Sequence, residues 1–147
     1  ILGCARDIAR YLHQSMKTIK TIADMFEDHR VYIYENDSID ETTKILMQYE
    51  KNNSKIKVFS ERFLQVQYRH RTWRLGYVRE KLKDKLIRDN FNPDYVIVLD
   101  LDDIGQYFNN AKEFVSKSLK LEQHWDGIFP HPTYDMWAYR SFNCKYN

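Results

Sequence analysis

The sequence predicts an α/β fold with a mostly parallel central sheet flanked by helices. Short runs rich in β-branched and aromatic residues alternate with longer segments whose apolar residues recur at helical spacing. The longest β-type run, residues 95–99, is apolar throughout, which is typical of a central strand covered on both faces. A length of 147 residues suits one domain. We therefore expect a single domain over residues 1–147, which could be truncated at either end because the chain begins without methionine.

The first half of the chain is expected to contain three strands separated by two helices. The first helix, over residues 7–26, has apolar residues every three or four positions. The second should begin at Ser38, because Ser38 and Glu41 have the spacing of a capping box, and end at residues 51–54. The expected strands comprise residues 1–3, 31–34 and 56–59.

The second half continues the same alternation. An amphipathic helix over residues 72–89 is followed by a turn at 90–94 and by the apolar strand at 95–99. A further helix is expected over residues 110–121, with Phe114, Val115 and Leu119 on its inner side, and a short strand at 127–129.

Acidic residues end the long apolar strand. On an extended chain Asp100 and Asp102 point the same way, whereas Asp103 points to the opposite side. Carboxylate oxygens suit Mg²⁺ or Mn²⁺, which is usually shared with a substrate phosphate. These aspartates are therefore predicted to hold a divalent cation, and the alternative is an ordinary strand end followed by an acidic helix cap.

A polar segment, residues 35–38, follows the second strand. In parallel sheets ligands bind beyond the carboxyl ends of the strands, where this segment and the acidic strand end should meet. Short polar side chains here, including Glu35 and Asp37, suit a nucleoside. Equally, Asp37 or Ser38 could only cap the next helix.

Arginines are concentrated ahead of the acidic strand. Arg71, Arg74 and Arg79 fall on successive or nearly successive helical turns, and guanidinium groups form planar donor pairs that suit phosphate oxygens. We expect Arg79 above all to contact a diphosphate. A solvated basic face is the alternative, and it fits the later residues Lys81, Lys83, Lys85 and Arg88 better.

Several properties narrow the function. A net charge of +2 does not imply nucleic acid or an anionic membrane, and no apolar run approaches the length of about 20 residues that spans a bilayer. We therefore expect a cytoplasmic protein with no transmembrane segment and no nucleic-acid partner. Cys4 and Cys144 are too few for a disulfide framework or a zinc site. Phosphate-binding loops and nucleophile elbows are absent from the sequence.

Four segments in this order resemble GT-A glycosyltransferases. Residues 34–43 resemble the loop after their second strand, residues 71–79 resemble their Arg-bearing helix, and Asp100-Leu-Asp102 is similar to their Asp-x-Asp motif. Residues 134–140, Tyr-Asp-Met-Trp-Ala-Tyr-Arg, look like the Tyr-Asp-x-Trp-Ala-Leu-Arg signature of capsule-polysaccharide glycosyltransferases and their relatives in large DNA viruses.

The resemblance implies a Rossmann-like GT-A catalytic domain that uses Mn²⁺ or Mg²⁺ and a UDP- or GDP-type sugar donor. The acceptor would be a glycan or glycoprotein, and Asp135 would lie near it as a general base if the reaction inverts configuration. Asp102, with Asp100, would hold the metal and the donor, and Arg79 would approach the diphosphate. The positions expected to hold the nucleoside are Cys4, Ala5, Arg6, Glu35 and Asp37.

Other functions remain open from the residues alone. Sugar nucleotidyltransferases use a similar sheet and metal. In haloacid-dehalogenase-like phosphatases an Asp-x-Asp motif supplies a nucleophile, although there it usually follows the first strand. A non-enzymatic nucleotide- or nucleic-acid-binding module is the third alternative.

Overall fold

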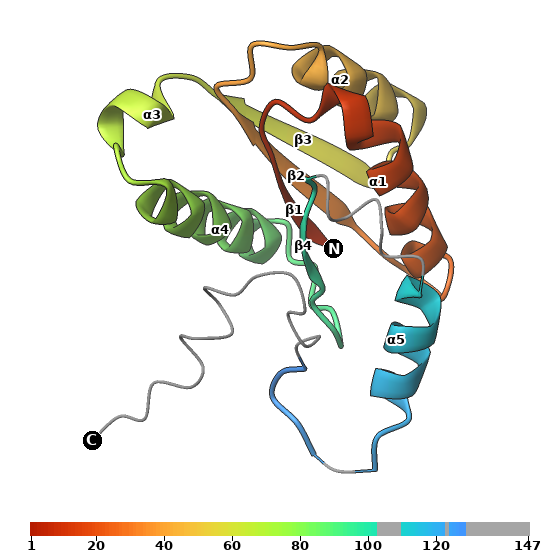
Figure 1. The fold of residues 1–147 in the computed structure, drawn as a ribbon. Coiled ribbons are helices and arrows are strands. Elements are labelled where there is room, and N and C mark those ends of the chain that lie inside the picture. Colours follow the sequence, from red (N-terminus) through yellow and green to blue (C-terminus); the bar gives the residue numbers. More distant parts are fainter. Residues whose placement is uncertain (103–109, 123, 129–147) are drawn as a thin grey trace, which may run out of the picture. The chain divides into compact units, whose positions relative to one another are not determined.

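The computed structural model describes residues 1–102, 110–122 and 124–128 (Figure 1). By internal contacts the chain divides into two compact units, residues 1–115 and 116–147. The strands are β1 (Leu2–Ala5), β2 (Val31–Asn36), β3 (Ile56–Glu61) and β4 (Val98–Asp100). The helices are α1 (Ala9–Ala23), α2 (Thr42–Asn52), α3 (Leu64–Gln67), α4 (Arg71–Arg88) and α5 (Ala111–Leu119). Within the described ranges, no helix combines the length and apolar character needed to cross a membrane.

The four described strands form one parallel sheet in the order β3-β2-β1-β4. Helices lie between successive strands in the chain, as parallel connections require. The predicted α/β class, with a parallel sheet flanked by helices, is therefore confirmed, and the architecture is compatible with a Rossmann-like fold. Strands β2 and β3 lie on one side of β1 and β4 lies on the other. Such a reversal of strand order marks where open α/β sheets bind ligands, beyond the carboxyl ends of the strands.

The alternation of side chains along β2 builds a core on each face of the sheet. Val31 and Ile33 belong to a buried cluster with α1 and α2, whereas Tyr32 and Tyr34 belong to a cluster with α3 and α4. All six residues of β2 are buried, as expected for a strand with neighbours on both sides and helices on both faces.

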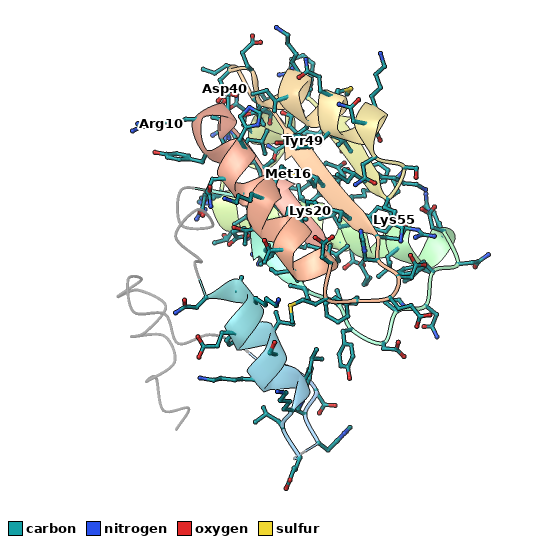
Figure 2. The ribbon with its side chains drawn as sticks, turned by 90° about the vertical axis from the view of Figure 1, so that its right-hand side faces the viewer. Arg10, Met16, Lys20, Asp40, Tyr49 and Lys55 are labelled. Carbon is teal, nitrogen blue, oxygen red and sulfur yellow. The ribbon has the colours of Figure 1, made fainter. Side chains whose placement is uncertain are left out.

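Helices α1 and α2 cover the first of these faces side by side (Figure 2). Leu12, Met16 and Ile19 of α1 follow helical spacing and are buried against the sheet, as the sequence pattern predicted. Tyr49 of α2 accepts or donates a hydrogen bond at 2.9 Å with His13 of α1, which ties the two helices together at their exposed edge.

The prediction of a central strand over residues 95–99 is wrong. Pairing in β4 begins only at Val98, and β4 lies at the edge of the described sheet. Tyr95, Val96 and Val98 are exposed by about half, whereas Ile97 and Leu99 pack against the core. One face of this strand is thus covered and the other is open, and continuous apolar character alone does not distinguish these cases.

Two smaller expectations also differ from the structure. Leu119 of α5 is 37 % exposed, so only Phe114 and Val115 of the three predicted positions pack inward. Gly127 and Ile128 are not in a strand. Helix α3 was not predicted, because four residues are too few to show a helical period.

Candidate functional site

The loops at the carboxyl ends of β1, β2 and β3 share an unusual backbone feature. Each contains a residue other than glycine in the left-handed region: Asp7 (φ 51°), Asp37 (φ 54°) and Phe63 (φ 69°). L-residues adopt this conformation at a cost, least for Asp and Asn, so surrounding contacts must hold it in place. Of the four described non-glycine residues with this conformation, three lie at the carboxyl edge of the sheet, and the fourth, Asn90 (φ 50°), lies in the turn after α4.

Two acidic residues at the end of β2 hold the second and third loops together. Glu35 is fully buried and accepts hydrogen bonds from the Ser38 amide at 2.9 Å and the Ser60 hydroxyl at 2.5 Å. Asp37 is 7 % exposed and accepts hydrogen bonds from the amides of Phe63 at 2.5 Å and Gln65 at 2.9 Å. Both carboxylates therefore position neighbouring backbone, and their predicted role as nucleoside ligands stays a prediction.

Opposing effects act on the pKa of Asp37. Burial alone raises it, but hydrogen bonds from the Gln65 amide, the Asn36 side chain and the Phe63 amide outweigh burial. The pKa is consequently lowered from its usual value, and the carboxylate stays charged at neutral pH.

Hydrogen bonds join the loop after β1 to the loop after β2, and each loop donates a backbone amide to a side chain of the other. The Asp7 amide donates to the Ser38 hydroxyl at 3.1 Å, and the Ile39 amide donates to the Asp7 carboxylate at 2.8 Å. The Ala9 amide, in the first turn of α1, donates to Asp40 at 3.0 Å. Figure 2 shows Asp40 where α1 and α2 begin.

The predicted capping box is therefore wrong. Helix α2 begins at Thr42 with Glu41 as its N-cap residue, and the Glu41 side chain makes no capping hydrogen bond; the Thr42 amide donates instead to the Asp40 carboxylate at 2.9 Å. Ser38 lies in the preceding loop and accepts a hydrogen bond from Asp7 instead. The Ser38 hydroxyl serves the loop after β1, a contact that sequence spacing could not reveal.

At the end of β1, three predicted site residues have different environments. Ala5 is 3 % exposed and belongs to the core, so only its backbone is available to a ligand. Arg6 donates to Gln65 at 2.7 Å and lies 3.5 Å from the Asp7 carboxylate. Cys4 is half-buried and is paired in register with Asp100 of β4.

Arg79 of α4 and Asp100 of β4 form an ion pair. Nη2 of Arg79 lies 3.1 Å from Oδ1 of Asp100, and the two side chains are 47 % and 48 % exposed. Both groups are thus paired with each other yet reachable from solvent. Two residues predicted from separate motifs, one for a diphosphate and one for a metal, are brought together here.

The charges of Arg79 and Asp100 act on the pKa of the neighbouring Cys4 thiol. Burial raises the pKa of Cys4 to about 11; the Arg79 guanidinium opposes that rise, and the Asp100 carboxylate adds to it. Cys4 is consequently a neutral thiol at physiological pH and not an activated nucleophile.

Leu101 separates the two predicted metal ligands. Its side chain is 2 % exposed and packs in the cluster with α1 and α2, which is the face opposite to Arg79. Asp100 thus lies on the α4 side of β4, and Asp102 follows the strand as a half-buried residue.

The other predicted arginines are arranged differently from Arg79. Nη1 of Arg74 donates to the backbone carbonyls of Tyr68 at 2.7 Å and Arg69 at 3.0 Å, so this side chain closes the turn between α3 and α4. Arg71 has an exposed side chain at the start of α4. Within the described ranges, Arg79 is the arginine of these three that forms an ion pair with an acidic residue.

The described part of the predicted metal site consists of two carboxylates, those of Asp100 and Asp102. Among the described residues, no group of three or more His, Cys, Asp and Glu side chains is arranged to hold a metal. Asp100 and Asp102 supply hard oxygen donors, which fit Mg²⁺ or Mn²⁺ when substrate phosphates complete the coordination. Asp103, Asp135 and the other residues of 134–140 lie outside the described residues.

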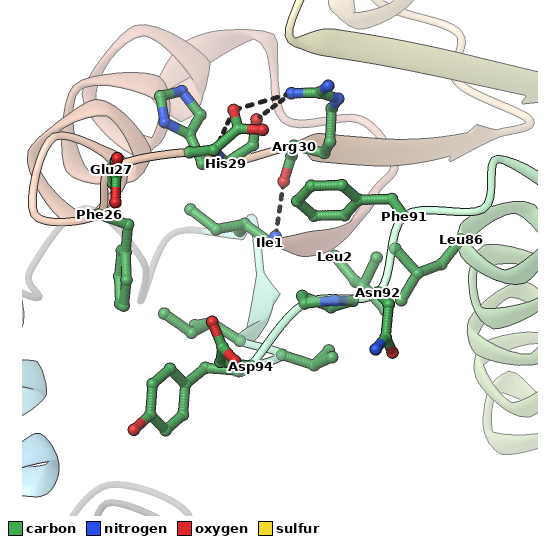
Figure 3. Close-up of a pocket in the computed structure, with 15 residues that line it drawn as sticks. Ile1, Leu2, Phe26, Glu27, His29, Arg30, Leu86, Phe91, Asn92 and Asp94 are labelled. Atoms are coloured by element: carbon green, nitrogen blue, oxygen red, sulfur yellow. Dashed lines mark hydrogen bonds and ion pairs between the residues drawn. The ribbon is translucent and has the colours of Figure 1, made fainter.

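Two cavities lie at the opposite edge of the sheet, where the strands begin. The first, of about 380 Å³, has walls that include Phe26, Phe91 and Tyr95 (Figure 3). Two of its charged lining residues pair with each other, since Asp28 lies 3.0 Å from Arg30, and Asp28 also lies 2.8 Å from Lys55. The second, of about 400 Å³, adjoins it and shares Arg30 and Phe91. We therefore place the candidate site at the carboxyl edge, where exposed charges and constrained loops coincide.

Comparison with protein-family models, with curated proteins and with solved structures finds no match for this chain.

Proposed function

We propose that this protein is a GT-A-type glycosyltransferase, which moves a sugar from a nucleotide-diphosphate donor to a hydroxyl group of a glycan or glycoprotein. The observation that carries this proposal is the pairing of Arg79 with Asp100 beside β1, at the point where strand order reverses. A phosphate-binding cation and a metal-binding anion at one ligand-binding edge suit a diphosphate better than an uncharged substrate.

In this proposal the donor lies along the carboxyl edge of the sheet. Its diphosphate would take the Arg79 guanidinium from Asp100, which would then be free to share a cation with the phosphate oxygens. The nucleoside would extend toward the loops after β1 and β2, whose backbone is fixed by the hydrogen bonds of Glu35 and Asp37. The backbone of Ala5 and the Arg6 side chain would border it.

Asp100 and Asp102 would hold the divalent cation, which when bound supplies positive charge to the leaving diphosphate. Arg79 would stabilise the same developing charge through its guanidinium donors. If the reaction inverts configuration, Asp135 would accept the proton of the acceptor hydroxyl. If it retains configuration, no base of this kind is needed.

Product analysis with a panel of UDP- and GDP-sugars and Mn²⁺ tests this proposal. The wild-type protein should release nucleoside diphosphate, and Asp102→Ala should abolish the release while the far-UV spectrum stays native. Asp94→Ala, at an exposed position before β4, is a matched control and should retain activity.

Other products would point to other reactions. Release of pyrophosphate would support a sugar nucleotidyltransferase. A phosphoaspartate trapped at Asp100 would support a phosphatase of the haloacid-dehalogenase type. Metal-dependent activity that is unchanged in Asp102→Ala would contradict the site assignment.

A further inference from the structure

The segment from residue 62 to residue 79 is strongly basic. It contains five arginines and one histidine and no aspartate or glutamate. The chain as a whole has a net charge of only +2. Positive charge is therefore concentrated in the stretch that comprises α3, the turn after it and the first half of α4.

Large apolar side chains in this segment are turned outward. Phe63 is 72 % exposed, Val66 is 69 % exposed and Trp73 is 66 % exposed. Leu64 and Val78 are buried, so α3 and α4 already use their inner sides to pack on the sheet. The exposed side chains are consequently an additional feature of these helices and not part of the core.

Phe63 is held outward by the backbone. Its φ of 69° is in the left-handed region, which is costly for an aromatic residue. The buried carboxylate of Asp37 fixes this conformation by accepting the Phe63 amide at 2.5 Å and the Gln65 amide at 2.9 Å. A buried acid thus maintains a strained backbone at a residue whose phenyl ring is exposed.

The arginines of this segment divide into two groups. Arg62 donates to the Ser38 carbonyl, Arg74 closes the turn before α4, and Arg79 pairs with Asp100. Arg69 and Arg71 have exposed side chains, and no described acidic residue pairs with them. These two positive charges lie between Val66 and Trp73 in the chain and remain available to a partner.

We propose that Phe63, Val66, Arg69, Arg71 and Trp73, here called the α3–α4 surface, form a docking site for an anionic lipid membrane. Aromatic and aliphatic side chains that insert at the headgroup boundary, flanked by arginines that attract anionic headgroups, are the combination that binds proteins to such surfaces. Charge complementarity is the argument for this partner, because the surface is positive and free of acids.

Nucleic acid fits the same surface less well. Aromatic rings and arginines could stack on bases, but the exposed aliphatic side chain of Val66 offers no stacking face, whereas it can insert at a lipid headgroup boundary. Membrane docking does not depend on the proposed glycosyl transfer, and it is measured without any donor.

Cosedimentation with vesicles tests the proposal. Wild-type protein should bind vesicles of phosphatidylcholine mixed with phosphatidylserine about tenfold or more tightly than vesicles of phosphatidylcholine alone, and added salt should weaken binding. The double variant Arg69→Ala/Arg71→Ala should lose about 25-fold in affinity, at about fivefold for each arginine. Phe63→Ser and Trp73→Ser should each lose about tenfold.

Matched controls lie in α1 and α2. The double variant Lys17→Ala/Lys51→Ala makes the same change in net charge at exposed positions and should bind like wild type. Equal binding to both kinds of vesicle would overturn the proposal, as would equal losses in the two double variants. Displacement of the protein from vesicles by a single-stranded oligonucleotide at lower concentration would overturn it in favour of nucleic acid.

Discussion

Asp37 offers a direct test of how the carboxyl edge is held together. Replacing it by asparagine keeps the size of the side chain and its tolerance of the left-handed backbone, which has φ 54° here. One oxygen is lost, however, and an NH₂ group then faces a backbone N–H group of either Phe63 or Gln65. The substitution therefore tests the hydrogen bonds rather than the backbone conformation.

The expected loss is large because the carboxylate is 7 % exposed. It accepts the Phe63 amide at 2.5 Å and the Gln65 amide at 2.9 Å. A hydrogen bond to a charged group contributes about 1.5 to 3 kcal/mol, and a buried donor left unpaired costs a similar amount. We expect Asp37→Asn to lower the free energy of unfolding by about 2 to 3 kcal/mol.

Urea unfolding followed by circular dichroism measures this loss at pH 7, and amide hydrogen exchange locates it. The amides of Phe63 and Gln65 should exchange faster in the variant. Asp24→Asn, at an exposed carboxylate that pairs with Lys20, is the matched control and should stay within about 0.5 kcal/mol of wild type. Wild-type stability in Asp37→Asn, with unchanged exchange at both amides, would refute the claim that the hydrogen bonds of Asp37 stabilise the carboxyl edge of the sheet.

The pH dependence has a defined sign. The pKa of Asp37 is lower in the folded protein than its usual 3.8, so its stabilising contribution is fully present above that value and is lost as pH falls through the folded-state pKa. The difference in stability between wild type and Asp37→Asn should therefore be constant near neutral pH and shrink below about pH 4. A difference that grows on acidification would contradict the assigned direction.

Three further predictions use single sites. Gly3→Ala should destabilise the protein by about 1 to 3 kcal/mol in urea unfolding, because the added Cβ would lie 2.9 Å from Leu101; an unchanged midpoint would contradict this close packing. Gly76→Ala should stabilise it by about 0.5 to 1 kcal/mol, because apart from the two chain neighbours and the local backbone of α4 no atom lies within 4 Å of the added Cβ, and a loss of stability would count against the reasoning. In a Cys144→Ser background, Cys4 should react slowly with iodoacetamide at pH 8 and faster only as pH approaches its pKa of about 11; rapid alkylation at pH 8 would be the contrary result.

The sequence allowed the fold class and most of the elements to be predicted because periodicity reports which side of an element is buried. The helix expected over residues 72–89 is α4, Arg71–Arg88, and the turn after it was also recognised. The strand at 95–99 was misjudged because β-branched residues suit exposed edge positions as well as central ones. Whether a strand has one neighbour or two depends on pairing with distant segments, which local composition does not encode.

The candidate site was predictable in outline and not in its contacts. Arg79 and Asp100 were identified separately, from helical spacing and from a strand end, and the structure adds that they pair at 3.1 Å. Arg74 and Asp37 were assigned to ligands, yet their side chains bind backbone groups that lie close only after folding. The left-handed backbone of Phe63 was not predicted, because the residues around it show no sequence pattern typical of that conformation. The absence of acids from residues 62–79 was visible and could have directed attention to that surface.

Titration calorimetry with UDP and GDP, each with and without Mn²⁺, tests the central claim most directly. The proposal predicts that one nucleoside diphosphate binds, that binding requires Mn²⁺, and that Arg79→Met and Asp100→Ala each weaken it about tenfold or more, as loss of a charged contact would. Asp94→Ala should leave the affinity unchanged. Failure of both nucleotides to bind in the presence of Mn²⁺ would contradict a metal–diphosphate site at this edge of the sheet. An affinity that is unchanged both without Mn²⁺ and in the Arg79→Met and Asp100→Ala variants would contradict it as well.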